Sequence, residues 1–185
     1  IFSLIDQKLL YSIFGRDAMA FREWGAFDSS GLVDAKTDTL IEAGENGLVY
    51  KVKLNTRYNP EEGTIDIAPQ ITKFRYQDMN NPEQGIENSP AFYKNYMYFC
   101  DNGGTFMCLD INTLKPVWIY DVGDDTDSTT VIEETSDGVF LYTANEIDKR
   151  CENGKSASAE CNIHKFNALT GELIWQKYYT CYYQF

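Results

Sequence analysis

The stretch GLVYKVKLNT at residues 47–56 decides the fold, because the chain repeats it at a fixed interval. It maps without a gap onto GTFMCLDINT at residues 104–113, an offset of 57 residues that takes Gly47 to Gly104 and Thr56 to Thr113. A further step of the same length lands on residues 163–170. Repeats of this length are typical of architectures in which each unit buries its apolar face only by stacking on a neighbour. The sequence therefore predicts a repeat protein.

Each repeat contains four short segments rich in β-branched and aromatic residues, separated by turns with Asn and Gly. This pattern is typical of a four-stranded propeller blade. The expected strands are 27–33, 39–43, 48–54 and 71–77 in the first unit, 89–94, 96–100, 105–110 and 116–122 in the middle unit, and 129–134, 138–144, 162–168 and 172–179 in the last unit. The sequence thus predicts an all-β fold, a β-propeller of four-stranded antiparallel blades.

The units divide the chain into about three full blades with a partial blade at each end. One incomplete propeller ring is expected over 1–185, with a partial blade and connector over 1–24, blades over 25–78, 86–122 and 129–179, and the start of a further blade over 180–185. Residues 1–14 fit the third and fourth strands of another unit, and 17–24 is the one moderately helical window. Residues 57–70 and 146–160 are expected to be long surface loops.

Composition and charge exclude several classes of partner. The chain has 185 residues, of which 43% are hydrophobic and 15% aromatic, enough for a sizeable core. Its 28 acidic and 16 basic residues give a net charge of -12, which repels phosphate backbones and anionic lipid headgroups. No stretch approaches the roughly 20 apolar residues of a membrane helix. We therefore expect neither a nucleic-acid partner nor a transmembrane segment.

The turn between the third and fourth strands carries the most specific motif. The segments CLDINTLKPVW at 108–118 and KFNALTGELIW at 165–175 share a Thr and a Trp at the same spacing. They resemble the repeats of quinoprotein (PQQ-like) β-propellers, whose unit carries Ala-x-Asp-x-x-Thr-Gly-x-x-x-Trp. The first segment has Cys108 and Leu114 in place of Ala and Gly, and the second has Lys165 and Asn167 in place of Ala and Asp. Residues 6–11 are a degenerate copy, and residues 51–56 keep only Thr56.

The motif residues suit a structural role between blades. Asp or Asn can accept backbone amides in a tight turn, and Gly supplies a positive φ. A Trp is large and flat enough to wedge between two blades. The residues expected to staple blades together are Asp110, Thr113, Trp118, Thr170, Gly171 and Trp175.

The resemblance implies a fold more than an activity. Propellers of this family occur in quinone-dependent alcohol and sugar dehydrogenases, in an outer-membrane assembly lipoprotein, and in secreted or cell-surface proteins, so it implies a secreted or cell-envelope location. Complete rings have about 7 or 8 blades, within the usual range. A dehydrogenase of this family would carry adjacent cysteines above the quinone and a Glu, Asn and Asp set for calcium. No two cysteines are adjacent here, so PQQ is not expected.

The run DVGDDTDSTT at 121–130 offers hard oxygen ligands for calcium. Asp124, Asp125 and Asp127 are the candidate ligands. The run lacks the ligand spacing and the closing Glu of a calcium loop, and the alternative is a solvated acidic loop.

The cysteines have a structural interpretation. Cys100 and Cys108 flank the turn at 101–104, where hairpin pairing would oppose them to about Thr105 and Met97, and both are interpreted as core thiols. Cys151 and Cys161 bracket a hairpin-like insertion, where a disulfide is an alternative in an extracellular protein.

His164 is expected on a strand, facing solvent or holding a satisfied hydrogen bond. The aromatic cluster at 178–185, which includes Tyr182 and Tyr183, is read either as strands buried between blades or as a sugar-stacking platform.

These observations favour a non-catalytic binding or scaffold module over an enzyme. Its contact surface is expected in the loops 57–70, 121–128 and 146–160. The expected partner is another protein or the remaining blades of the same propeller. The alternatives are a PQQ-dependent dehydrogenase whose active site lies in other blades, and a polysaccharide or cell-wall binding module.

Overall fold

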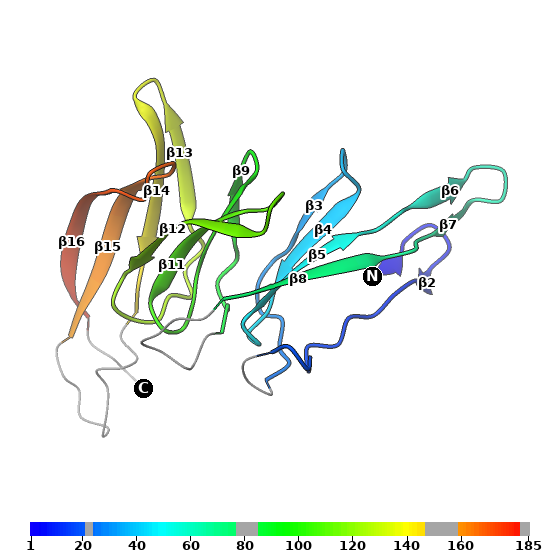
Figure 1. Ribbon diagram of the computed structural model, residues 1–185, viewed down its shortest axis with the longest axis horizontal. Helices are drawn as coiled ribbons and strands as arrows, with labels where there is room; N and C mark the ends of the chain where they lie inside the picture. Colours follow the sequence, from blue (N-terminus) through cyan, green and yellow to red (C-terminus); the bar gives the residue numbers. More distant parts are fainter. Residues whose placement is uncertain (21–23, 77–84, 147–158, 182–185) are drawn as a thin grey trace.

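Three four-stranded antiparallel sheets stand side by side along the long axis of the molecule (Figure 1). The computed structural model describes residues 1–20, 24–76, 85–146 and 159–181, and within the last range it describes side chains for 162–179. No helix forms in these ranges. These ranges therefore contain no helix that is long and apolar enough to cross a membrane. The prediction of an all-β architecture is confirmed.

We name the sheets first, middle and last, in chain order. The first sheet contains β3 (Leu32–Asp34), β4 (Thr39–Ala43), β5 (Leu48–Lys53) and β8 (Gln70–Arg75). The middle sheet contains β9 (Ala91–Tyr93), β10 (Tyr96–Cys100), β11 (Thr105–Asp110) and β12 (Lys115–Asp121). The last sheet contains β13 (Val131–Thr135), β14 (Gly138–Ala144), β15 (Ala159–Asn167) and β16 (Leu173–Cys181). In each sheet the strands pair in chain order, as in a propeller blade.

The last two strands are longer than expected. β16 runs on to Cys181 because Thr180 and Cys181 pair with Glu160 and Ala159 at the start of β15. The prediction that residues 180 and 181 begin a further blade is therefore wrong. Residues 182–185 lie outside the described residues.

The long loop after β5 contains a hairpin that the sequence reading missed. β6 (Arg57–Asn59) pairs with β7 (Thr64–Asp66) in a two-stranded sheet of its own. The side chain of Asn59 accepts the backbone N–H of Glu61 at 3.0 Å, and Gly63 adopts a φ of 62°. These local bonds fold the expected loop into an arm that extends away from the first sheet (Figure 1).

The N-terminal residues form a smaller hairpin and a segment across the first sheet. β1 (Phe2–Ser3) pairs with β2 (Lys8–Leu9) in a two-stranded sheet, and the expectation that residues 1–14 belong to a further blade stays a prediction. In the weakly helical window, residues 17–20 make a single turn in which the N–H of Ala20 donates to Asp17 O at 2.9 Å.

The hairpin register of the middle sheet differs by one residue from the expected one. Cys100 pairs with Phe106 and Cys108 with Tyr98. The reason is the turn, where Asp101 Oδ1 accepts the N–H of Gly103 at 2.9 Å and of Thr105 at 2.7 Å.

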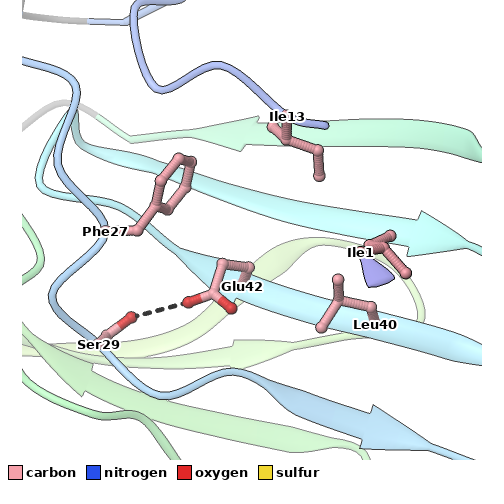
Figure 2. Close-up of a pocket in the computed structure, with 6 residues that line it drawn as sticks. All are labelled: Ile1, Ile13, Phe27, Ser29, Leu40 and Glu42. Atoms are coloured by element: carbon pink, nitrogen blue, oxygen red, sulfur yellow. Dashed lines mark hydrogen bonds between the residues drawn. The ribbon is translucent and has the colours of Figure 1, made fainter. Parts of the chain in front are cut away.

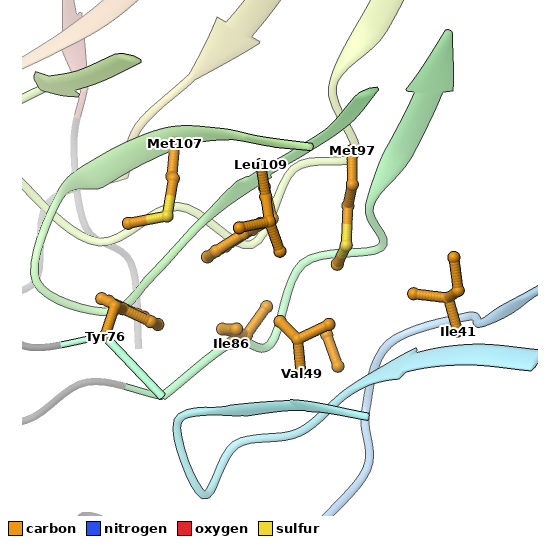
Figure 3. Packing of buried hydrophobic residues seen from close by; sticks show 9 residues of the cluster. Ile41, Val49, Tyr76, Ile86, Met97, Met107 and Leu109 are labelled. Carbon is orange, nitrogen blue, oxygen red and sulfur yellow. The ribbon is translucent and has the colours of Figure 1, made fainter. Parts of the chain in front are cut away.

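The core consists of layers between neighbouring sheets. Between the first and middle sheets, apolar side chains of both interdigitate (Figure 3), among them Ile41, Val49, Met97, Met107 and Leu109. A second layer between the middle and last sheets includes Tyr98, Phe106, Leu141 and Phe166. The outer face of the first sheet packs Leu48, Tyr50 and Val52 against the N-terminal segment. The first and middle sheets thus bury both of their faces by stacking, and the last sheet buries the face toward the middle sheet, as the repeat predicts.

Candidate functional sites at the seams between sheets

The turn between the third and fourth strands is built in the same way in the middle and last sheets. In the middle sheet, Asp110 Oδ1 accepts the backbone N–H of Thr113 at 3.0 Å. In the last sheet, Asn167 Oδ1 accepts the backbone N–H of Thr170 at 3.1 Å. Both residue types offer a side-chain oxygen to backbone donors. The replacement of Asp by Asn therefore leaves the turn intact.

The position after this Thr is left-handed in both turns. The φ angle is 52° at Leu114 and 72° at Gly171, a region that costs residues with a Cβ about 1–2 kcal/mol. Leu114 offsets this cost by packing against the core between the first and middle sheets. At Gly171 a Cβ would lie 2.6 Å from the indole ring of Trp118. A side chain is therefore accommodated at the first turn and excluded from the second.

Trp118 bridges the seam between the middle and last sheets. Its indole Nε1 on β12 donates a 2.9 Å hydrogen bond to Ala168 O in the β15–β16 turn. Its ring lies nearly parallel to that of Phe166, with centroids 6.3 Å apart, and meets Phe106 edge-on at 5.2 Å. Aromatic contacts of this kind stabilise beyond the area they bury. One side chain thus joins two sheets by packing and by a hydrogen bond.

Trp175 holds the same position one repeat later, on a face that no described element covers. It pairs with Lys165 across β15 and β16, and its ring lies 6.1 Å from that of Tyr142. Its side chain is 42% exposed. We call this side of the last sheet the open face.

The first copy of the repeated threonine is held differently. The N–H and the hydroxyl of Thr56 donate to the carboxylate of Asp38, at 2.8 and 2.6 Å. Asp38 belongs to the turn between β3 and β4. Thr56 therefore ties two turns of the first sheet together, because the chain continues into β6 instead of turning directly into the fourth strand.

The acidic loop after β12 is largely buried between the middle and last sheets. Asp124 and Asp125 are 3% and 8% exposed, whereas Asp127 is exposed, so the interpretation as a solvated loop is wrong for the first two. Burial, together with the charges of Asp127, Glu146 and Glu87, raises the pKa of Asp125 to about 7. Within the described ranges, no three His, Cys, Asp or Glu side chains gather in a way that could hold a metal ion. Calcium binding by Asp124, Asp125 and Asp127 stays a prediction.

A pocket of about 300 Å³ opens between the N-terminal segment and the first sheet (Figure 2). Ile1, Ile13, Phe27 and Leu40 form apolar walls, and Ser29 and Glu42 are its polar residues. The Ser29 hydroxyl donates to Glu42 Oε1 at 3.1 Å, and burial raises the pKa of the Glu42 carboxyl. An apolar pocket with one carboxyl group suits a small ligand that carries a hydrogen-bond donor.

A second pocket, of about 370 Å³, is also lined by Ile13 under the same segment. Asp17, Tyr50 and Lys73 line it as a polar group. Lys73 Nζ lies 2.5 Å from Asp17 Oδ2, and the Tyr50 hydroxyl donates to the same oxygen at 3.3 Å. Burial raises the pKa of Tyr50 to about 12, so its hydroxyl stays protonated.

Solved structures with a similar fold come from propeller proteins. BamB from Moraxella catarrhalis matches with 16% identity and a TM-score of 0.50, over 80% of this chain and 37% of that one. A europium-containing methanol dehydrogenase matches with 14% identity and a TM-score of 0.52, over 84% and 26%. Quinohemoprotein alcohol dehydrogenase from Comamonas testosteroni matches with 15% identity and a TM-score of 0.53, over 83% and 21%. No protein-family model and no curated protein matches the sequence.

The protein has the fold of a quinoprotein-like β-propeller. The described sheets are blades of an open arc, and the ring is not closed. The chain spans between 21% and 37% of the length of the three proteins above. At these identities the likeness concerns the fold alone.

The two free cysteines in the described part of the chain are core thiols, as predicted. Cys100 and Cys108 are buried, and burial raises the pKa of each thiol to about 12. Since the thiolate is the reactive form, neither side chain is suited to nucleophilic chemistry. Cys151 and the side chain of Cys161 lie outside the described residues, and their disulfide stays a prediction.

His164 lies inside the propeller, contrary to both expectations for it. It is 2% exposed, and its Nδ1 has no hydrogen-bond partner in the described part of the chain. Burial lowers the pKa of the imidazole. The side chain faces the middle sheet because it alternates with Lys165 along β15.

The C-terminal aromatics of the described propeller are on its surface. Tyr178 and Tyr179 on β16 are 51% and 43% exposed, so the interpretation as strands buried between blades is wrong for these two. Tyr182 and Tyr183 lie outside the described residues.

Sequence reasoning missed the two pockets under the N-terminal segment. They join residues more than 25 positions apart, such as Ile13 with Leu40, and no local pattern links them. One signal was available for the first pocket, because Glu42 places a charge between the apolar residues Ile41 and Ala43 of the expected strand.

Proposed function

We propose that this propeller is a non-catalytic binding module that contacts a protein partner through the loops at the rim of its blades, in a secreted or cell-envelope setting. The observation that carries the proposal is the folded β6–β7 arm. All three residues of β6 are exposed, and Tyr58 presents 56% of its surface. An ordered, exposed hairpin that is not needed for a blade core is a ready contact element.

Photo-crosslinking tests this proposal. A photoreactive amino acid at Tyr58 is expected to capture a discrete protein from an envelope extract of the producing organism. The same probe at Ile119, 58% exposed on β12 of the middle sheet, serves as the control. Equal crosslinking from both positions, or none from Tyr58, contradicts a contact through the arm.

The exposed Tyr178 and Tyr179 favour a second candidate function, the binding of polysaccharide. Aromatic side chains on a strand surface offer flat apolar faces to sugar rings. Retention on polysaccharide resin that is lost on Tyr178→Ala and Tyr179→Ala supports this candidate. Retention that is unchanged, or absent in the unmodified protein, removes it.

A quinone-dependent dehydrogenase is tested on the same preparation. Addition of PQQ with calcium to the full chain is expected to leave the melting temperature unchanged. A concentration-dependent rise would support the dehydrogenase, because a ligand that binds only the folded state stabilises it.

A further inference from the structure

A pocket of about 250 Å³ lies at the seam between the first and middle sheets. Apolar Ile41 and Ile111 line it together with Lys51, Lys53 and the hydroxyl-bearing Thr39. The volume is several times the roughly 30 Å³ that one water takes up in the liquid. It approaches the lower end of ligand pockets, about 300 Å³. The seam therefore has room for a fragment-sized ligand.

The pocket exists where the first sheet lacks the tryptophan that fills the next seam. Trp118 on β12 pairs with Cys108, the residue one repeat after Lys51. Lys51 itself pairs with Thr72 on β8, so Thr72 stands where the next sheet has the tryptophan. Trp118 reaches Ala168 in the following turn, and the residue one repeat before Ala168 is Ile111, which lines the pocket. The pocket thus adjoins the place that corresponds to the Trp118 indole, and Leu114, the counterpart of Gly171, packs its own side chain into that seam.

The charge at this seam is opposite in sign to the net charge of the molecule. Lys51 is half-buried, and its ammonium joins no ion pair or side-chain hydrogen bond in the described structure. Lys53 donates to the backbone oxygen of Thr37. The one carboxylate of the lining, that of Asp34, accepts the Thr37 hydroxyl at 2.6 Å within its own turn. Lys51 is therefore the cation that remains for a ligand.

We infer that this seam pocket binds an aromatic carboxylate. The aromatic ring of the ligand lies between Ile41 and Ile111, and the ligand carboxylate contacts the Lys51 ammonium in a charge-assisted hydrogen bond. Two sources carry this chemistry, a free aromatic acid and the C-terminal tryptophan of a peptide. The site is distinct from the β6–β7 arm and does not depend on the function proposed for it.

Titration by NMR or calorimetry tests the pocket with defined probes. Indole-3-propionate is the free acid, and indole-3-propionamide is its neutral match. A peptide that ends in tryptophan is compared with the same peptide amidated at its C-terminus. At least one acid is expected to bind saturably, and about tenfold more tightly than its amide, because a charged partner is lost in the amide. The acid that binds identifies the source.

Two variants locate the site. Lys51→Met keeps the aliphatic stem and removes the charge, so affinity for the acid is expected to fall about tenfold or more. Lys177→Met, on an exposed strand of the last sheet, is the matched control and leaves affinity unchanged. Ile111→Trp, at a residue that lines the pocket, is expected to fill it and abolish binding.

Three results would overturn the assignment. They are no saturable binding of either acid up to millimolar concentration, equal binding of acid and amide, and unchanged affinity in Lys51→Met. If Ile111→Trp does not fold, as judged by circular dichroism, the comparison of Lys51→Met with Lys177→Met decides the matter alone.

Discussion

At the scale of single residues, the seam between the middle and last sheets depends on Trp118 and Gly171 as a pair. The indole takes the space that a side chain at 171 would need, and it uses the Ala168 carbonyl of the same turn as its acceptor. A Gly at this position thus serves both the turn, through its positive φ, and the neighbouring blade, through its missing Cβ.

Truncation of Trp118 tests the seam directly. Trp118→Ala is expected to lower the free energy of unfolding by about 3 kcal/mol, because it leaves a cavity and removes the bond to Ala168. Trp175→Ala, the same change on the open face, is expected to cost less than about 1 kcal/mol. Urea unfolding followed by far-UV circular dichroism measures both. Equal losses would show that Trp118 does not join the two sheets.

A double-mutant cycle tests the coupling of Gly171 to Trp118. Gly171→Ala alone is expected to cost about 2–3 kcal/mol, from the positive φ and from the clash with the indole. In the Trp118→Ala background only the backbone cost, about 1 kcal/mol, should remain. The interaction energy comes from urea unfolding of the four proteins. Additive losses would mean that the indole and the turn do not compete for space.

The buried Asp125 predicts a pH dependence of stability. Its pKa is raised to about 7, chiefly by burial, so the folded state binds the proton more tightly than the unfolded state. The resulting stability is complete below the ordinary pKa of Asp and is lost as pH rises through 7. A shift of about 3 units corresponds to as much as about 4 kcal/mol.

The difference between the unmodified chain and Asp125→Asn isolates this group, because the lowered pKa of His164 and the raised pKa values of Glu42 and Asp101 act in both proteins. Between pH 5 and pH 8 the unfolding free energy is expected to fall more, or to rise less, in the unmodified chain than in Asp125→Asn. Carboxyl groups with lowered pKa values, such as Asp110, change the stability mainly below pH 5, where they make it rise with pH. An equal change in the Asn variant would assign the pH dependence to another group.

At the scale of elements, the β6–β7 arm is an addition to the first blade. The arm lies between β5 and β8 in the chain, and these two strands pair with each other directly. In the described part of the chain, one surface ion pair joins the arm to the remaining residues, between Lys8 and Asp66 at 3.5 Å. Surface pairs of this kind contribute about 0–1 kcal/mol. The blade should therefore fold without the arm.

Replacement of residues 57–66 by a short Gly-Ser linker tests this independence. The melting temperature is expected to change little, with a loss of at most about 1 kcal/mol, while retention of the protein partner in a pull-down is lost. Differential scanning calorimetry and amide exchange of β5 and β8 give the stability. Loss of protection in those strands would make the arm part of the blade core.

At the scale of the whole molecule, the last sheet presents exposed apolar side chains on its open face. Val131, Trp175 and Tyr179 expose 60%, 42% and 43% of their surfaces there. Exposed apolar faces of this kind promote association. The chain is therefore expected to self-associate as its concentration rises.

Trp175→Glu is expected to reduce this self-association, because it places a charge in the middle of the apolar face. Tyr58→Glu, an equally drastic change on the distant arm, should not. Sedimentation velocity over a range of concentrations separates the two. Equal effects of both variants would assign the association to net charge alone.

The sequence by itself determined the repeat, the blade count of the described arc and the turn motif. A strand or a turn depends on neighbouring residues, and the repeat is a constant interval of 57 residues, so all three can be recognised in the sequence. What only the tertiary structure decided are the contacts between units: Trp118 over Gly171, the buried His164, the pocket around Glu42, and the seam beside Lys51. Each depends on which faces of two sheets meet, and that is set by packing between residues far apart in the chain. The repeat that fixed the architecture left the contents of each seam free to differ.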